Sequence, residues 1–290
     1  MFFDNKFLRT LEKVELVVKK TMNTGLQGHH VSHNPGGGLE FKEHREYQPG
    51  DDYRYIDWNL YSRLGQLFLK QFTEEREIIV YFLIDKSDSM TFGQSSKFTY
   101  AVKSAAALGY IALTQLDRIG VSFFDESLAE SFKPGKGKNR VHQFFDFLSR
   151  VESGGKTNLN QAINEFSYRY KKPGLAVILS DFLDEKGYQQ GLKRLKENNW
   201  NVFVIQTLTK NEVDPNFEGE VLLIDTETNE GKELEINQQT LDNYRQNLNK
   251  FCEQLKKFSQ KYGIKYFQVL SESKIEDLIF ETLYKEEGVR

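Results

Sequence analysis

The sequence predicts an α/β protein built on a doubly wound, mostly parallel sheet that is flanked by helices. From residue 76 onward, short apolar segments alternate with longer segments whose apolar residues recur at helical spacing. The short segments are hydrophobic throughout, which is typical of parallel strands buried on both faces. Because crossovers between such strands are right-handed, the connecting helices are expected on both sides of the sheet.

The expected elements follow one another in a regular order. Strands are predicted at 77–84, 119–124, 175–179, 202–207 and 264–270, with a short edge strand at 128–132. Helices are predicted at 97–116, 140–151, 158–170, 241–258 and 275–283, where apolar residues form one stripe. Residues 220–236 contain the turn sequence DTETNEG and are expected to form a hairpin insert.

The first part of the chain has a different pattern, so we expect an N-terminal extension at 1–75 and the sheet domain at 76–290. Residues 7–22 have helical spacing, and 25–38 are a loop rich in glycine and histidine. Residues 66–72 alternate between polar and apolar side chains, as a strand does. A segment of this length and composition does not readily build a core alone.

The composition excludes several classes of protein. The 290 residues carry 39 Lys+Arg and 42 Asp+Glu, a net charge of -3, which argues against a nucleic-acid partner. The single cysteine, Cys252, excludes a disulfide scaffold. The longest apolar run, Ile78 to Ile84, is far shorter than the roughly 20 residues of a membrane span, and the N-terminus lacks a signal-peptide core. We therefore expect a cytoplasmic protein without a membrane span.

Polar side chains follow two of the apolar strands. Asp85 ends the first strand and Asp181 follows a later one. Buried carboxylates are costly, and two that are close repel each other unless a cation lies between them. In an extended loop, Ser87 and Ser89 point the same way as Asp85, and Thr157 offers another hydroxyl at the start of a helix. Such hard oxygen ligands suit Mg²⁺, or Mn²⁺ or Ca²⁺, whereas helix capping is the simpler alternative.

The order Asp-x-Ser-x-Ser, then Thr, then Asp resembles the metal-ion-dependent adhesion site of von Willebrand factor type A domains, which are Rossmann-like. The resemblance implies that one divalent cation is held by five residues: Asp85, Ser87, Ser89, Thr157 and Asp181. It also implies that an acidic residue of a partner protein completes the coordination of the metal. The chain would then be a protein–protein interaction module.

The segment before the first strand is similar to domain-of-unknown-function family fifty-eight, a bacterial family with a type A domain. The matching residues are Arg45-Glu46-Tyr47, Pro49-Gly50-Asp51-Asp52, Arg54, Ile56-Asp57-Trp58 and Ser62-Arg63. This resemblance implies a MoxR-type AAA+ ATPase as partner and a chaperone-like or adaptor role. Within the segment, we expect Arg45, Arg54 and Arg63 to pair with Asp51, Asp52 and Asp57 in a structural network. An interaction surface is the alternative.

The same residues allow other functions. A metal-dependent phosphatase or other hydrolase could use Asp85 as nucleophile, but Ser87 stands where a general acid is expected, so we expect no enzyme. A structural scaffold whose metal site never fills is a third possibility. His29, His30 and His33 could bind a transition metal, although the surrounding glycines favour a plain loop.

Overall fold

The computed structural model describes residues 2–14, 16, 39–74, 79–91, 96–115, 117–215, 219–224, 231–285 and 289. The chain divides into two compact units, Met1–Lys20 with Ile78–Arg290, and Thr21–Glu77. The first helix, α1 (Asn5–Leu11), thus belongs to the larger unit and not to a continuous extension at 1–75, because Leu8 and Leu11 pack into the core of that unit. The histidine loop at 29–33 lies outside the described residues.

The larger unit is built on a six-stranded sheet in the order β10-β7-β6-β3-β4-β5. Its strands are β3 (Ile79–Asp85), β4 (Arg118–Phe124), β5 (Leu128–Gly135), β6 (Leu175–Ser180), β7 (Asn201–Leu208) and β10 (Lys265–Leu270). Every pairing is parallel except that of β4 with the edge strand β5. The expected doubly wound, mostly parallel sheet is therefore confirmed.

Two hydrophobic cores lie on the two faces of this sheet, and β3 shows why its sequence is apolar throughout. Val80, Phe82 and Ile84 point into one core, while Tyr81 and Leu83 point into the other. Alternation of side chains between faces means that a strand covered on both sides needs apolar residues at every position. The central strand is buried from Val80 onward.

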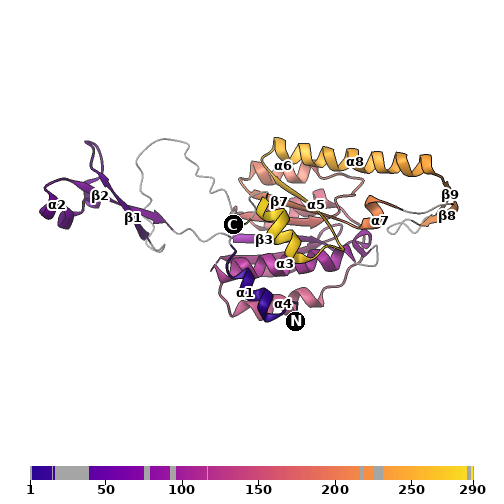
Figure 1. Cartoon of the computed structure of the whole chain (residues 1–290), viewed down its shortest axis with the longest axis horizontal. Coiled ribbons are helices and arrows are strands. Elements are labelled where there is room, and N and C mark those ends of the chain that lie inside the picture. The colour runs from indigo at the N-terminus through magenta and orange to yellow at the C-terminus, as the bar shows by residue number, and fades with distance from the viewer. Residues whose placement is uncertain are drawn as a thin grey trace. The chain divides into compact units, whose positions relative to one another are not determined.

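Helices cover both faces, as Figure 1 shows for the larger unit. One face carries α1, α3 (Lys97–Thr114), α4 (Arg140–Arg150) and the C-terminal helical segment, α9 (Ile275–Asp277) with η3 (Leu278–Leu283). The other face carries α5 (Leu159–Arg169), α6 (Gln189–Glu197) and α8 (Gln238–Lys261). Among the described residues, no helix combines the length and the apolar character needed to cross a bilayer.

Shorter elements complete the larger unit. A one-turn helix, η2 (Asp88–Thr91), follows β3, and α7 (Lys210–Val213) follows β7. The strands β8 (Gly219–Ile224) and β9 (Gly231–Ile236) form the antiparallel hairpin expected at 220–236. Of the helix expected at 7–22, α1 covers the residues up to Leu11, and Glu12 is its C-cap. Residues 15 and 17–22 lie outside the described residues.

The smaller unit holds two strands and two short helices among its described residues. It contains the antiparallel pair β1 (Leu39–Glu46) and β2 (Phe68–Glu74), which are joined by η1 (Tyr53–Tyr55) and α2 (Trp58–Leu64). Two of the expected ion pairs are present: Arg45 with Asp51 at 2.8 Å and Arg54 with Asp52 at 2.6 Å. The expectation of an arginine partner was wrong for Asp57, because its ion pairs are with His44 and Lys70.

Candidate functional site

The carboxyl ends of β3 and β6 lie side by side at the middle of the sheet. Successive strands β4 and β5 extend the sheet on one side of β3, and β6, β7 and β10 extend it on the other. The order of the strands therefore reverses between β3 and β6, where Ile84 pairs with Leu179. In open α/β sheets this is the point at which ligands bind. Both aspartates singled out from the sequence stand there.

Asp85 is completely buried, and both of its carboxylate oxygens accept hydrogen bonds. The backbone N–H of Ser87 donates to Oδ1 over 3.0 Å, and Thr157 Oγ1 donates to the same oxygen over 3.1 Å. Ser180 Oγ donates to Oδ2 over 2.7 Å. Three chain segments thus converge on one carboxylate, which offsets part of the cost of burying it.

The two predicted serines connect this loop to Asp181. Ser87 Oγ and Ser89 Oγ are 3.2 Å apart, and Ser89 Oγ donates to Asp181 Oδ2 over 3.1 Å. The backbone N–H of Leu183 donates to the other oxygen, Oδ1, over 3.0 Å. All five residues predicted from the sequence are therefore gathered in one cluster at the reversal of strand order.

Backbone hydrogen bonds hold the Thr157 loop against the β3 loop. The N–H of Asp88 donates to the carbonyl of Gly155 over 2.8 Å, and the N–H of Gly154 donates to the carbonyl of Lys86 over 2.6 Å. Gly155 has φ +99°, and a Cβ atom there would lie only 3.3 Å from Asp125 Cβ. The glycine therefore permits both the turn and the close approach that bring Thr157 to Asp85.

The residue after Asp181 adopts a backbone conformation that residues other than glycine rarely take. Phe182 has φ 62°, is fully buried, and donates its N–H to Ser180 Oγ over 2.9 Å. This left-handed backbone costs about 1–2 kcal/mol and persists only where the surroundings enforce it. The hydrogen bond from the Phe182 N–H to Ser180 Oγ is one of the contacts that hold this turn.

A buried lysine stands beside the cluster and was not predicted from the sequence. Lys97 Nζ lies 2.7 Å from Asp181 Oδ2 and 2.5 Å from Glu212 Oε1, with its side chain 1% exposed. Burial alone lowers the pKa of Lys97, but the two carboxylates outweigh that effect and leave the pKa raised. Lys97 is therefore charged at neutral pH.

Three residues of the site, Ser180, Lys97 and Glu212, were not predicted from the sequence, although each has an unusual feature in it. Ser180 directly precedes Asp181 at the end of an apolar strand. Lys97 begins a helix, where a cation is unfavourable. Glu212 completes a Thr-x-x-Glu capping box with Thr209, a pattern that marks the start of a helix.

The electrostatics of Asp85 differ from those of an exposed carboxylate. Burial raises its pKa to about 6, and the negative charge of Asp181 adds to the rise. Hydrogen bonds from Ser180 and Ser87 act in the opposite direction. A positive charge placed between the two aspartates would relieve this repulsion.

The chemistry of the cluster fits a hard divalent cation. Its side chains offer carboxylate and hydroxyl oxygens only, which suits Mg²⁺, Mn²⁺ or Ca²⁺. Nowhere in the described part of the chain do three or more His, Cys, Asp or Glu side chains converge as metal ligands, so a zinc-type site has no support there. Asp85 and Asp181 would supply the negative charge, and Ser87, Ser89 and Thr157 the neutral oxygens.

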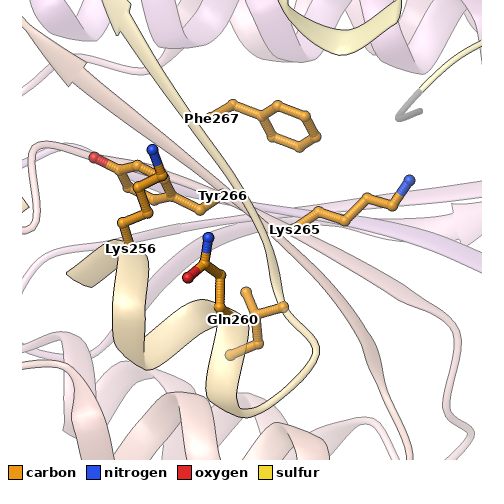
Figure 2. A pocket seen from close by; sticks show the side chains of 6 residues that line it. Lys256, Gln260, Lys265, Tyr266 and Phe267 are labelled. Atoms are coloured by element: carbon orange, nitrogen blue, oxygen red, sulfur yellow. The ribbon is translucent and has the colours of Figure 1, made fainter. Parts of the chain in front are cut away.

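A groove lies elsewhere on the larger unit, as Figure 2 shows. Its volume is about 170 Å³, and it is lined by Lys256, Gln260, Ile264, Lys265, Tyr266 and Phe267. The first two belong to α8, and the last three to the beginning of the edge strand β10. The groove thus flanks the amino-terminal half of an edge strand, whereas the candidate site lies where the central strands end. Its volume is also below that of ordinary ligand pockets, about 300 Å³ or more.

Known proteins similar to this chain include uncharacterized proteins of mycobacteria. Uncharacterized protein Rv1480 of Mycobacterium tuberculosis is 28% identical over 246 residues, which cover 83% of this chain and 77% of that protein. The same values hold for uncharacterized protein Mb1516 of Mycobacterium bovis. Among solved structures, BatB from Bacteroides thetaiotaomicron has 15% identity and a TM-score of 0.46, covering 72% of this chain and 98% of that chain.

A family model assigns the chain more directly. The model described as "Protein of unknown function DUF58" matches residues 43–257, which include the Arg45–Arg63 segment and all five predicted site residues. The resemblance drawn from that segment is thereby confirmed, and the chain belongs to the DUF58 family.

Proposed function

We propose that this chain is a metal-dependent protein–protein interaction module that binds an acidic residue of its partner through a divalent cation, Mg²⁺ in the first instance. One observation supports the proposal above all others. Five oxygen-bearing side chains from separate loops converge at the reversal of strand order, among them Asp85, Thr157 and Asp181. No feature of the sheet itself requires these polar residues at its centre.

The coordination of the cation, rather than the net charge of the site, explains why an acidic partner suits the site. Two aspartates neutralise a divalent cation, and the remaining ligands are uncharged hydroxyls. A bound cation would supply a Lewis-acidic position that attracts a further anionic oxygen. Buried charge of this kind favours recognition of a carboxylate over a neutral side chain.

The partner that we propose is a MoxR-type AAA+ ATPase in the cytoplasm, with this chain acting as a chaperone-like adaptor. The support is the resemblance of the Arg45–Arg63 segment to a family associated with such ATPases, together with membership of that family. The near-neutral charge of the chain, -3 over 290 residues, favours a protein partner over a nucleic acid.

A catalytic role has less support. A nucleophile has to reach its substrate, whereas Asp85 is fully buried and hydrogen-bonded at both oxygens. Lys97 favours a different second candidate, a structural scaffold without metal, because its ammonium already neutralises part of the cluster. Metal binding separates this scaffold from the interaction module.

Two measurements test the proposal. Isothermal titration of the full chain with Mg²⁺ or Mn²⁺ should give one site that is lost in Asp85→Asn. Immobilised chain should capture an AAA+ ATPase from a bacterial lysate with Mg²⁺ but not with EDTA, and the Asp85→Asn variant should capture none. If neither the wild type nor any site variant binds metal, the structural scaffold is favoured. If the chain hydrolyses a phosphate ester in a metal-dependent reaction, the hydrolase is favoured.

A further inference from the structure

Lys97 occupies a position that is unfavourable for a lysine on two counts. It is the first residue of α3, directly after the N-cap Ser96, where the helix dipole presents positive charge. It is also almost completely buried, at 1% exposed, and an ammonium group without compensation is costly there. Neither helix stability nor hydrophobic packing explains this residue, so its carboxylate partners must account for it.

The two partners of Lys97 are held in different ways. Asp181 Oδ2 is shared, because it also accepts a hydrogen bond from Ser89 Oγ in the candidate site. Glu212 is fixed from outside the site: its Oε2 accepts the Thr209 N–H over 2.7 Å and the Thr209 hydroxyl over 3.0 Å. Its other oxygen, Oε1, is thereby left facing Lys97. The ammonium thus bridges a site carboxylate and a carboxylate anchored on α7.

The charges of this group match a divalent cation. Asp85, Asp181 and Glu212 carry three negative charges when ionised, and Lys97 carries one positive charge. The remainder of two negative charges is what a divalent cation neutralises. A cation that binds Asp181 Oδ2 would contact the same oxygen as the Lys97 ammonium. The two positive charges would then lie close together and repel each other.

We infer that Lys97 competes with a divalent cation for Asp181 and thereby sets the affinity of the site for that cation. When a cation binds Asp181, the Lys97 ammonium stays paired with Glu212. The inference rests on the proposed metal-binding function. In this arrangement the two members of one ion pair have opposite effects. Lys97 weakens cation binding, whereas Glu212 strengthens it by drawing the ammonium away from Asp181.

Two near-isosteric variants separate this role from a structural one. Lys97→Met removes the competing charge and should tighten Mn²⁺ binding at least about tenfold. Glu212→Gln keeps the capping box but leaves Asp181 as the one carboxylate partner of Lys97, so Mn²⁺ binding should weaken by about tenfold. If Lys97 and Glu212 were merely a structural pair with no electrostatic effect on the site, breaking it from either side would change the affinity in the same direction or not at all.

The experiment is isothermal titration of the full chain with Mn²⁺, for the wild type and both variants. Circular dichroism confirms that each variant is folded, and Glu212→Gln carries the test alone if Lys97→Met fails to fold. Lys193→Met and Glu197→Gln are matched controls, because these residues form an exposed pair at 3.6 Å on α6.

The outcomes distinguish the two proposals. Opposite shifts in affinity support the inference, as does binding that appears only in Lys97→Met. Unchanged affinity in both variants, with normal wild-type binding, overturns the inference and leaves the proposed function standing. If neither the wild type nor Lys97→Met binds Mn²⁺, the metal site itself is refuted, and the role of Lys97 falls with it.

Discussion

Ser180 Oγ donates a hydrogen bond to Asp85 Oδ2 over 2.7 Å and so joins the end of β6 to the end of β3. The same hydroxyl oxygen accepts a hydrogen bond from the N–H of Phe182 over 2.9 Å, and Phe182 is the residue in the left-handed conformation. One small side chain therefore stabilises both a buried carboxylate and a strained turn. It acts where the strand order reverses, between the two strands that carry the aspartates.

Ser180→Ala is expected to destabilise the protein by about 1–3 kcal/mol. It leaves the buried N–H of Phe182 without its partner, and it leaves Asp85 Oδ2 with only the 3.4 Å contact from Thr157 Oγ1. Urea denaturation followed by circular dichroism measures the loss. Ser167→Ala is the control, since Ser167 is also buried but its hydroxyl has no hydrogen-bond partner within the described part of the chain. A similar loss in both variants would contradict the role given to Ser180.

Asp85→Asn should change how the stability of the metal-free protein depends on pH. The raised pKa of Asp85, about 6 against about 3.9 in the unfolded chain, means that the folded state holds the proton more tightly. The contribution of Asp85 to stability therefore falls as the pH rises from about 4 to about 6. Urea denaturation in EDTA across this range should show that fall in the wild type and not in Asp85→Asn. If the stability of the two proteins changed with pH in the same way, Asp85 would not contribute to the pH dependence.

The strands and most of the helices of the larger unit could be predicted because their sequences carry the constraint directly. A strand such as β3 is apolar at every position, since both faces of it are buried. The helix α6 was missed because only Gly191, Leu192 and Leu195 are buried among its nine residues, a stripe too narrow to stand out from a polar segment. In the smaller unit, β1 and α2 escaped for a similar reason, since charged and aromatic residues are closely mixed there.

The five candidate ligands could be predicted because a general rule places ligands at the carboxyl ends of parallel strands. The partner of Lys97 could not, because a lysine at the start of a helix is an unusual choice but does not indicate which carboxylate it meets. Asp181 is 84 residues away in sequence and meets Lys97 only through the packing of α3 on the sheet. Glu212 joins the same group from the end of β7, a further strand away. Local sequence patterns predict which groups lie at one edge, but not which charges tertiary packing adds beside them.

Thr157→Val is expected to weaken Mg²⁺ binding by tenfold or more, about the loss seen when a group that supports a metal is removed. Valine keeps the shape of the side chain but removes the hydroxyl that donates to Asp85 Oδ1. Thr157→Ser keeps that hydroxyl and should retain most of the affinity. Titration calorimetry compares the three proteins. Equal affinity in the valine and serine variants would exclude Thr157 from the site.

Asp57 should determine the stability of the smaller unit. Its Oδ1 caps α2 by accepting the N–H groups of Asn59 and Leu60, and its Oδ2 lies 2.9 Å from His44 Nε2 and 3.4 Å from Lys70 Nζ. The hydrogen bond to His44 is the main reason why the pKa of Asp57 is lowered to about 2. One carboxylate thus joins a helix to two neighbouring strands.

Two substitutions separate the cap from the charge. Asp57→Asn keeps an oxygen that can cap α2 but removes the charge, whereas Asp57→Ala removes both. Because the folded pKa is depressed, the charge stabilises the unit above about pH 4, and the effect is lost as the pH falls toward 2. Hydrogen exchange of residues 39–74 at pH 7 should therefore be fastest in Asp57→Ala and intermediate in Asp57→Asn. Equal exchange in Asp57→Asn and the wild type would show that the cap alone matters, and that the contacts with His44 and Lys70 add nothing.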